Sequence, residues 1–186
     1  MPARIVGPDG LLLRRWTPAD ADVLGQAVLE SSDHLRPWMP WVAGEPLSVD
    51  QRRAMLAGWE REWSQGGDAV LGILADGCVA GSCGLHRRIG PGGVEIGYWV
   101  HPAFTRRGLA TTAARLLTEA AFSLPAIDRV EIHHDRANAA SAGIPRKLGF
   151  ELIDEIPALE QSAPAEIGID CRWRMTREGW VRRSAR

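Results

Sequence analysis

The sequence predicts one α/β domain, residues 1–186, in which a mixed sheet is layered with helices. Three observations support this prediction. The chain is long enough for one hydrophobic core and too short for two domains of usual size. Hydrophobic residues make up 45% and charged residues 24%, which is ordinary globular usage. Segments of strand and helix period alternate in the order β, α, α, β, β, β, α, β, α, β, β.

In the first half of the chain, local signals mark where helices begin and end. Thr17 and Pro18 form an N-cap followed by proline at the first helical position. Two prolines in His34–Trp41 do not fit a helix, so we expect a loop there. The expected elements are a strand at 11–15, a helix from 18 to about 30, and a second helix from a Ser48 cap to Gly66.

In the second half, an alternating pattern predicts a meander of three strands. Asp76-Gly77 is a strong hairpin signal between the first two of them. Gly149 marks the end of the last predicted helix. The expected elements are strands at 69–74, 78–88 and 94–100, a helix at 108–122, a strand at 129–135, a helix at 139–148, and strands at 151–156 and 167–175.

The stretch 98–111 joins the end of a strand to the start of a helix and carries the features of an anion site. The helix begins at Gly108, directly after Arg106 and Arg107. Unpaired amides in a first helical turn bind phosphate oxygens, and glycine allows a ligand to approach the backbone closely. Taken alone, the same stretch also fits a solvated turn. A second stretch decides between the two interpretations.

That second stretch runs from Asp135 to Phe150, and with the first it resembles the two signature motifs of the GNAT acetyltransferase superfamily. Further similarity points to the RimJ/RimL-type branch of bacterial N-acetyltransferases, and it covers nearly the whole chain. The similar segments are Leu13-Arg14 with Asp20, residues 35–41, residues 95–100 and residues 176–180. One departure is Thr105, which replaces the arginine or glutamine of the first motif. The resemblance implies a GNAT-like, mostly antiparallel central sheet.

The resemblance also implies that acetyl-CoA is the acyl donor. Its pyrophosphate would lie on the amides of the first motif, and its pantetheine would run between the strands that end at Val100 and Asp135. Asn138 would bind the pantetheine arm, although the sequence fits a helix N-cap at this position equally well. The residues implied to contact the donor are Trp99, Val100, Arg106, Arg107, Gly108, Leu109, Ala110, Thr111 and Asn138.

Acetyl transfer needs a group that stabilises the leaving thiolate. Many GNAT enzymes carry a tyrosine seven residues after the motif asparagine, but Pro145 stands there in this chain. Tyr98 is the chain's sole tyrosine, and strand alternation places it on the face of Val94, so a tyrosine acid is not expected. The RimJ/RimL branch uses a serine, which predicts this role for Ser141. Alternatively, Ser141 bonds the backbone near the helix start.

The reaction also needs a base, because the acceptor amine must be neutral before it attacks. Glu95 is the favoured candidate, since it is the ionisable residue on the strand face that it shares with Gly97 and Trp99. Its alternative role is a structural partner for Arg87 or Arg88. The weaker candidates all lie on predicted strands: His86, Glu131, His133 and His134.

The acceptor is expected to bind beside Trp38 and Trp41, which lie in the proline-bounded loop. The alternative for both is core packing, which we also predict for Trp59 and Trp63. A protein N-terminal α-amine is the family default. Its pKa near 8.0 lies about 2.4 units below that of lysine, so it demands less of a base. Small-molecule amines, including antibiotics, a larger acyl donor, and a non-catalytic acyl-CoA sensor stay open as alternatives.

Composition excludes several other classes of protein. A net charge of −1 provides no general field for nucleic acid, and no stretch is apolar enough to span a membrane. Three cysteines without metal-ligand spacing predict neither a zinc site nor a disulfide framework. We therefore expect a cytoplasmic enzyme without a metal, whose partners are an acyl-CoA and an amine acceptor. The sequence does not indicate an oligomeric state.

Overall fold

The computed structural model describes residues 1–158 and 163–184. Within this part of the chain, eight strands form one sheet in the order β1-β2-β3-β4-β5-β6-β8-β7, and every neighbouring pair is antiparallel except β5 and β6. The mixed, mostly antiparallel sheet of a GNAT fold is thereby confirmed. The strands are β1 Arg4–Val6, β2 Leu11–Arg15, β3 Ala69–Ala75, β4 Cys78–His86, β5 Gly93–Val100, β6 Arg129–Asp135, β7 Glu151–Pro157 and β8 Ile169–Thr176.

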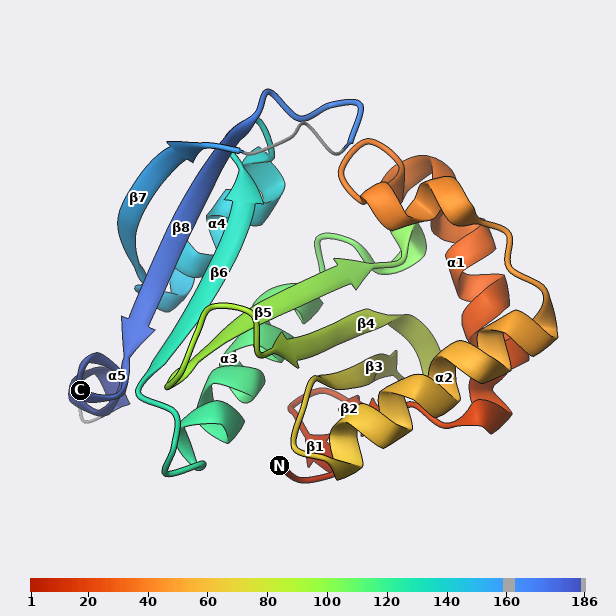
Figure 1. Ribbon diagram of the computed structural model, residues 1–186, viewed down its shortest axis with the longest axis horizontal. Helices are drawn as coiled ribbons and strands as arrows, with labels where there is room; N and C mark the ends of the chain where they lie inside the picture. Colours follow the sequence, from red (N-terminus) through yellow and green to blue (C-terminus); the bar gives the residue numbers. More distant parts are fainter. Residues whose placement is uncertain (159–162, 185–186) are drawn as a thin grey trace.

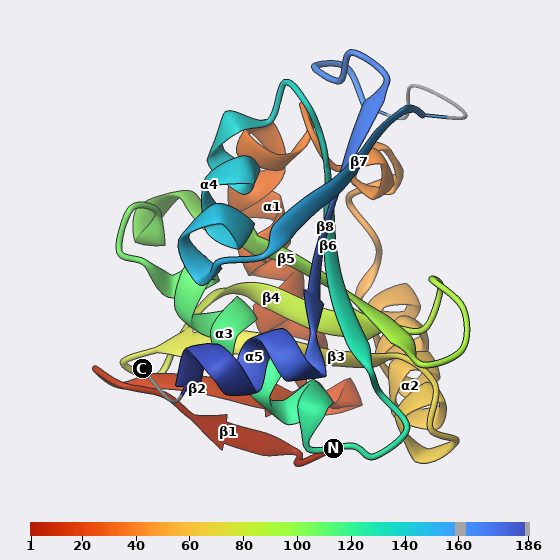
Figure 2. The same ribbon diagram turned by 90° about the vertical axis from the view of Figure 1, so that its left-hand side faces the viewer.

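The helices cover the two faces of this sheet (Figures 1 and 2). Helices α1 and α2 contact β4 and β3 on one face, whereas α3 packs against β4, β5 and β6, and α4 packs against β6, on the other. A short helix, α5, follows β8, and its Trp180 lies 6.4 Å from the ring of Phe122 in α3. The helices are α1 Ala21–Leu35, α2 Val49–Ser64, α3 Leu109–Phe122, α4 Ala139–Leu148 and α5 Arg177–Ser184.

Two buried clusters lie on opposite faces of the sheet. The larger one joins the sheet to α3 and includes Val94 and Ile96 of β5. The smaller one lies under α1 and α2 around Trp16, whose indole nitrogen donates to Ser82 Oγ at 3.0 Å. Trp99 of β5 packs against this smaller cluster. Alternate residues of β5 therefore face different helix layers, as its alternating sequence predicts.

The structure differs from the expected elements mainly at their ends. Helix α1 continues to Leu35 instead of ending near Glu30, because the first proline that opposes it stands only at Pro37. A 3₁₀ turn at Pro18–Asp20 precedes α1, with Thr17 as its cap. Strand β1 and helix α5 were not predicted, since three and eight residues are too short for a periodic signal. None of the described helices is long and apolar enough to cross a bilayer.

Candidate active site

Strands β5 and β6 diverge at the centre of the sheet. They pair only where residues 93–95 meet residues 129–131. Beyond Glu95, β5 continues with β4 alone as far as Val100, and β6 continues with β8 as far as Asp135. The two arrows consequently separate toward their tips (Figure 1). This V-shaped opening lies between the two strand ends at which the sequence predicts the pantetheine.

The turn before α3 presents a row of unpaired amides at the end of this opening. Among the described residues, none accepts a hydrogen bond from the backbone N–H groups of residues 106–111. Arg106 and Gly108 both have positive φ, at 63° and 77°, which bends the chain into this turn. Arg107 extends over Phe104 and lies 3.6 Å from Asp76. Amides and exposed guanidinium groups at a helix start fit a phosphate group.

The first turn of α4 lies across the opening from the end of β5. Asn138 Oδ1 accepts from the amide of Ser141 at 3.0 Å, so the N-cap interpretation of Asn138 is correct. The Ser141 hydroxyl lies 2.9 Å from the hydroxyl of Tyr98. The strand face predicted for Tyr98 is correct, and its phenol reaches Ser141, a contact that the sequence does not indicate. Burial raises the pKa of Tyr98 to about 12, against the opposing hydrogen bond with Ser141.

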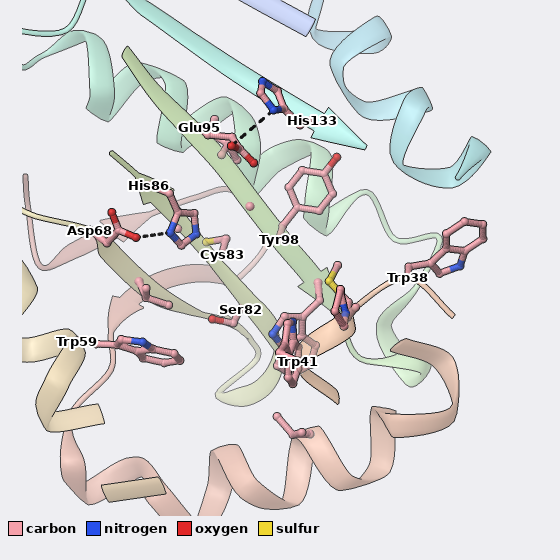
Figure 3. A pocket seen from close by; sticks show the side chains of 18 of the residues that line it. Trp38, Trp41, Trp59, Asp68, Ser82, Cys83, His86, Glu95, Tyr98 and His133 are labelled. Carbon is pink, nitrogen blue, oxygen red and sulfur yellow. Dashed lines mark hydrogen bonds and ion pairs between the residues drawn. The ribbon is translucent and has the colours of Figure 1, made fainter. Parts of the chain in front are cut away.

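A cavity of about 830 Å³ connects this corner to the helix layer of α1 and α2. The structure brings both predicted acceptor-site residues, Trp38 and Trp41, to its wall (Figure 3). The Trp41 ring is tilted against that of Trp99, with centroids 6.4 Å apart. Trp63 packs against the larger core as predicted. Trp59 packs against the smaller core as predicted, and it also lines the cavity.

Glu95, the base candidate of the sequence, is held by an arginine. Arg88 donates to both of its carboxylate oxygens, at 2.8 and 2.5 Å. The carboxylate is only 8% exposed, and the Nδ1 atom of His133 lies 3.6 Å from it. His133 in turn bonds Glu131 at 2.7 Å. The contacts of Glu95 thus match the alternative that the sequence left open, a structural partner for Arg88.

A second ionisable pair lies beside Glu95, at the end of β4, where His86 is the cross-strand partner of Glu95. His86 Nδ1 is 2.6 Å from a carboxylate oxygen of Asp68 (Figure 3). The sequence names His86 among its weaker candidates and does not name Asp68. The two residues stand 18 positions apart, and the antiparallel pairing of β3 with β4 brings them together. No short motif contains both, which is why local pattern reading misses the pair.

The fold and these two motif sites agree with a family-level match. The model of the acetyltransferase (GNAT) domain matches residues 10–151, which is most of the chain. The chain belongs to the GNAT acetyltransferase family. As a GNAT enzyme it takes its acetyl group from acetyl-CoA, and the amides at 106–111 are suited to the donor's pyrophosphate. No group of three or more metal-ligating side chains is found in the described residues.

Among curated proteins, this GNAT chain is similar to YdaF of Bacillus subtilis (strain 168), which carries the provisional name of a ribosomal N-acetyltransferase. The two are 30% identical over 147 residues, or 75% of this chain and 77% of YdaF.

Several solved structures share the fold. RimL, a ribosomal L7/L12 α-N-protein acetyltransferase in complex with coenzyme A, has a TM-score of 0.86 at 20% identity, covering 95% of this chain and 99% of RimL. RimJ of Mycobacterium smegmatis, in complex with a CoA disulfide, has a TM-score of 0.82 at 22% identity, covering 98% of this chain and 92% of RimJ. The microcin C7 self-immunity acetyltransferase MccE, in complex with acetyl-CoA and AMP, has a TM-score of 0.85 at 18% identity, covering 95% of this chain and 97% of MccE.

Proposed function

We propose that this GNAT enzyme acetylates the N-terminal α-amine of a protein, with ribosomal proteins as the acceptor class. The observation that carries the proposal is the cavity of about 830 Å³ between the Ser141 corner and the walls formed by Trp38, Trp41 and Trp59. This space is far larger than an amine needs, and its aromatic walls suit the side chains of an extended peptide. The names of YdaF and RimL support the same acceptor class. Such a substrate places the enzyme in the cytoplasm.

In this proposal the donor is held on one side of β5 and the acceptor on the other. The amides at 106–111, with Arg106 and Arg107, hold the pyrophosphate, and Trp99, Val100 and Asn138 flank the pantetheine arm. The amine nitrogen attacks the thioester carbon, the C–S bond breaks, and the electron pair goes to sulfur. Ser141 donates a hydrogen bond to the resulting thiolate.

Tyr98 supports Ser141 in this role. With its pKa raised to about 12, the phenol stays protonated at neutral pH and can donate to Ser141 Oγ. The serine hydroxyl is then free to point its proton at the sulfur. A coenzyme thiol is a good leaving group, since a free thiol has a pKa of about 8.5, so a hydrogen bond suffices and a strong acid is not required.

Glu95 is the base that the sequence favours, although Arg88 donates to both of its oxygens. It lies on the same face of β5 as Trp99, and a proton could reach it from the amine through a water molecule. If it is the base, Glu95→Gln flattens the acid limb of the kcat/KM profile. If Glu95→Gln keeps the acid limb of this profile, another group takes the proton.

The acceptor class is tested by thiol release with peptides that copy ribosomal-protein N-termini. Matched peptides carry a formyl group on the α-amine and keep an internal lysine. We expect turnover only with the free α-amine, and mass spectrometry should place the acetyl group there. Equal turnover with formylated peptides would refute the α-amine assignment. Turnover of small amines alone would favour a small-molecule acceptor, and tight CoA binding without any turnover would favour a sensor.

A further inference from the structure

His86 is fixed by a carboxylate that can only accept hydrogen bonds. One oxygen of Asp68 accepts from the amide of Arg87 at 2.8 Å, and the other lies 2.6 Å from His86 Nδ1. Burial alone would raise the pKa of Asp68, but these two hydrogen bonds and the nearby charges of His86 and Arg88 together leave that pKa below its ordinary value. Because the ionised carboxylate has no proton to give, the neutral imidazole carries its proton on Nδ1. Its Nε2 atom therefore keeps a free lone pair.

Two glycines let this imidazole lie over the strands. Gly84 of β4 and Gly97 of β5 form a cross-strand pair, two positions along from the pair of His86 with Glu95 and therefore on the same face. A Cβ built on either glycine would stand 3.2 Å from His86 Nε2, which is closer than ordinary contact. Nε2 is thus placed above Gly97, within the part of β5 that has left β6. This is the face that also carries Trp99, on the side of α1 and α2.

The charged groups around His86 come from every neighbouring element. The other acidic, basic and histidine side chains that line the same cavity are Glu45 before α2, Arg52 and Glu62 of α2, Asp68 before β3, Arg88 after β4, Glu95 of β5, His133, His134 and Asp135 of β6, and Glu166 before β8. Both oxygens of Glu95 are taken by Arg88, and His133 is bonded to Glu131. Asp68 is the carboxylate in direct contact with the imidazole. His86 therefore has an orienting partner and an unoccupied nitrogen, while Glu95 has neither oxygen free.

We propose that His86 is the general base of the reaction and that Asp68 is its positioning residue. Nε2 takes a proton from the ammonium form of the acceptor, and the neutral nitrogen then attacks the thioester carbon. The second N–H proton is released to solvent when the tetrahedral adduct collapses and the thiolate leaves. Asp68 keeps the imidazole in the Nδ1–H form and stabilises the imidazolium that forms. The assignment rests on the proposed acetylation of an amine, and it holds for any amine acceptor.

The test compares kcat/KM against pH for the wild type, His86→Gln and Asp68→Asn, using an amine that the wild type acetylates. We expect His86→Gln to lower kcat/KM about a hundredfold near neutral pH, the lower end for a general base. The deficit should narrow as pH rises past the pKa of the α-amine, near 8, because the acceptor then arrives neutral. Asp68→Asn should also lower kcat/KM, because the side-chain amide of the new asparagine donates to Nδ1 of His86 and moves the ring proton to Nε2.

Matched control variants are His34→Gln and Asp154→Asn, which change exposed side chains on α1 and β7. They should leave the profile unchanged. Titration with acetyl-CoA separates a folding defect from a chemical one, because His86 is not among the residues assigned to the donor and the donor affinity should be kept. A His86→Gln enzyme that retains the wild-type acid limb, with a deficit independent of pH, overturns the proposal. If Glu95→Gln alone removes that limb, the base is Glu95.

A measurement on the unmodified protein decides the geometry even if the acceptor class is wrong. Long-range ¹⁵N–¹H NMR distinguishes the two tautomers of a histidine ring. At a pH where the ring is neutral, we expect His86 as the Nδ1–H form in the wild type and a shift toward the Nε2–H form in Asp68→Asn. A wild-type ring protonated on Nε2 would overturn the proposal. Failure of peptide acetylation, with either NMR result, would bear on the acceptor class alone.

Discussion

Gly108→Ala separates two reasons for a glycine in the turn before α3: the positive φ of the backbone and the close approach of the donor's phosphate. The residue has a φ of 77°, and no atom of the described residues lies within 4 Å of the position of a Cβ there. Alanine therefore meets no neighbouring protein atom, and its cost to folding is the left-handed backbone, about 1–2 kcal/mol. In a chain of this length, each kcal/mol lowers Tm by about 2–4 °C. A second cost appears only when the donor binds.

That second cost follows from where the methyl group stands. It projects from the turn whose amides, at 106–111, lack acceptors among the described residues. Displacing a phosphate from even one charge-assisted hydrogen bond costs about 1.5–3 kcal/mol. We therefore expect Gly108→Ala to weaken acetyl-CoA binding at least about tenfold, a difference of 1.4 kcal/mol.

The matched control is Gly66→Ala, at the end of α2. Gly66 has a φ of 74° and also has open space around the Cβ position, so the backbone strain is the same. Thermal unfolding should give similar losses for both variants, and isothermal titration should show weakened binding for Gly108→Ala alone. If the two variants bind acetyl-CoA equally well, the pyrophosphate does not lie on this turn.

Three further predictions concern the donor side and the fold. Joint replacement of Arg106 and Arg107 by alanine should lower acetyl-CoA affinity by about 1 kcal/mol for each, since both are exposed, and titration at two salt concentrations should show a weaker salt dependence. Ser141→Ala should lower kcat about tenfold at unchanged donor affinity, measured by thiol release and titration; an unchanged kcat would remove Ser141 from the chemistry. Asp20→Asn should destabilise the fold by about 2–3 kcal/mol, because Arg14 loses a bidentate partner at 2.9 Å. The pKa of Asp20 is lowered chiefly by its hydrogen bond with Arg14. Its contribution to the free energy of unfolding is therefore full above the pKa of the unfolded state and is lost as pH falls through the pKa of the folded state. Urea unfolding at several acidic pH values should show a smaller loss of stability with falling pH in the variant than in the wild type.

The order of elements could be predicted because each one carries its own signal. Ser48 caps α2 as predicted, through reciprocal bonds with Gln51, and Asp76-Gly77 forms the expected tight turn with φ of 51° and 81°. The turn at 106–111 could be put forward as a phosphate site for the same reason, since its residues are contiguous in the chain. A strand of three residues, β1, and a helix of eight residues, α5, give too short a pattern to register.

The contacts of His86 and Tyr98 could not be predicted, because they depend on register between distant segments. Asp68 meets His86 only once β3 and β4 are paired. The phenol of Tyr98 meets Ser141 only because β5 leaves β6 and opens a path to α4. Strand alternation gives the correct face for Tyr98, but it does not give the reach of a long side chain across a gap. Arg88 bonding to Glu95 was foreseen only as an alternative.

The divergence of β5 from β6 explains how one strand can serve both substrates. Within a closed sheet, successive side chains of β5 would be separated by the sheet itself, with Gly97 and Trp99 on one face and Tyr98 on the other. Because β5 has no partner beyond Glu95 on the side of β6, a thioester lying along that edge is within reach of both faces. His86 then acts from the α1 and α2 face above Gly97, and Tyr98 acts through Ser141 from the α3 and α4 face. A one-residue slip of β5 would exchange these faces and place the phenol among the tryptophans, so the register of this short strand determines which substrate meets the base and which meets the hydroxyl pair.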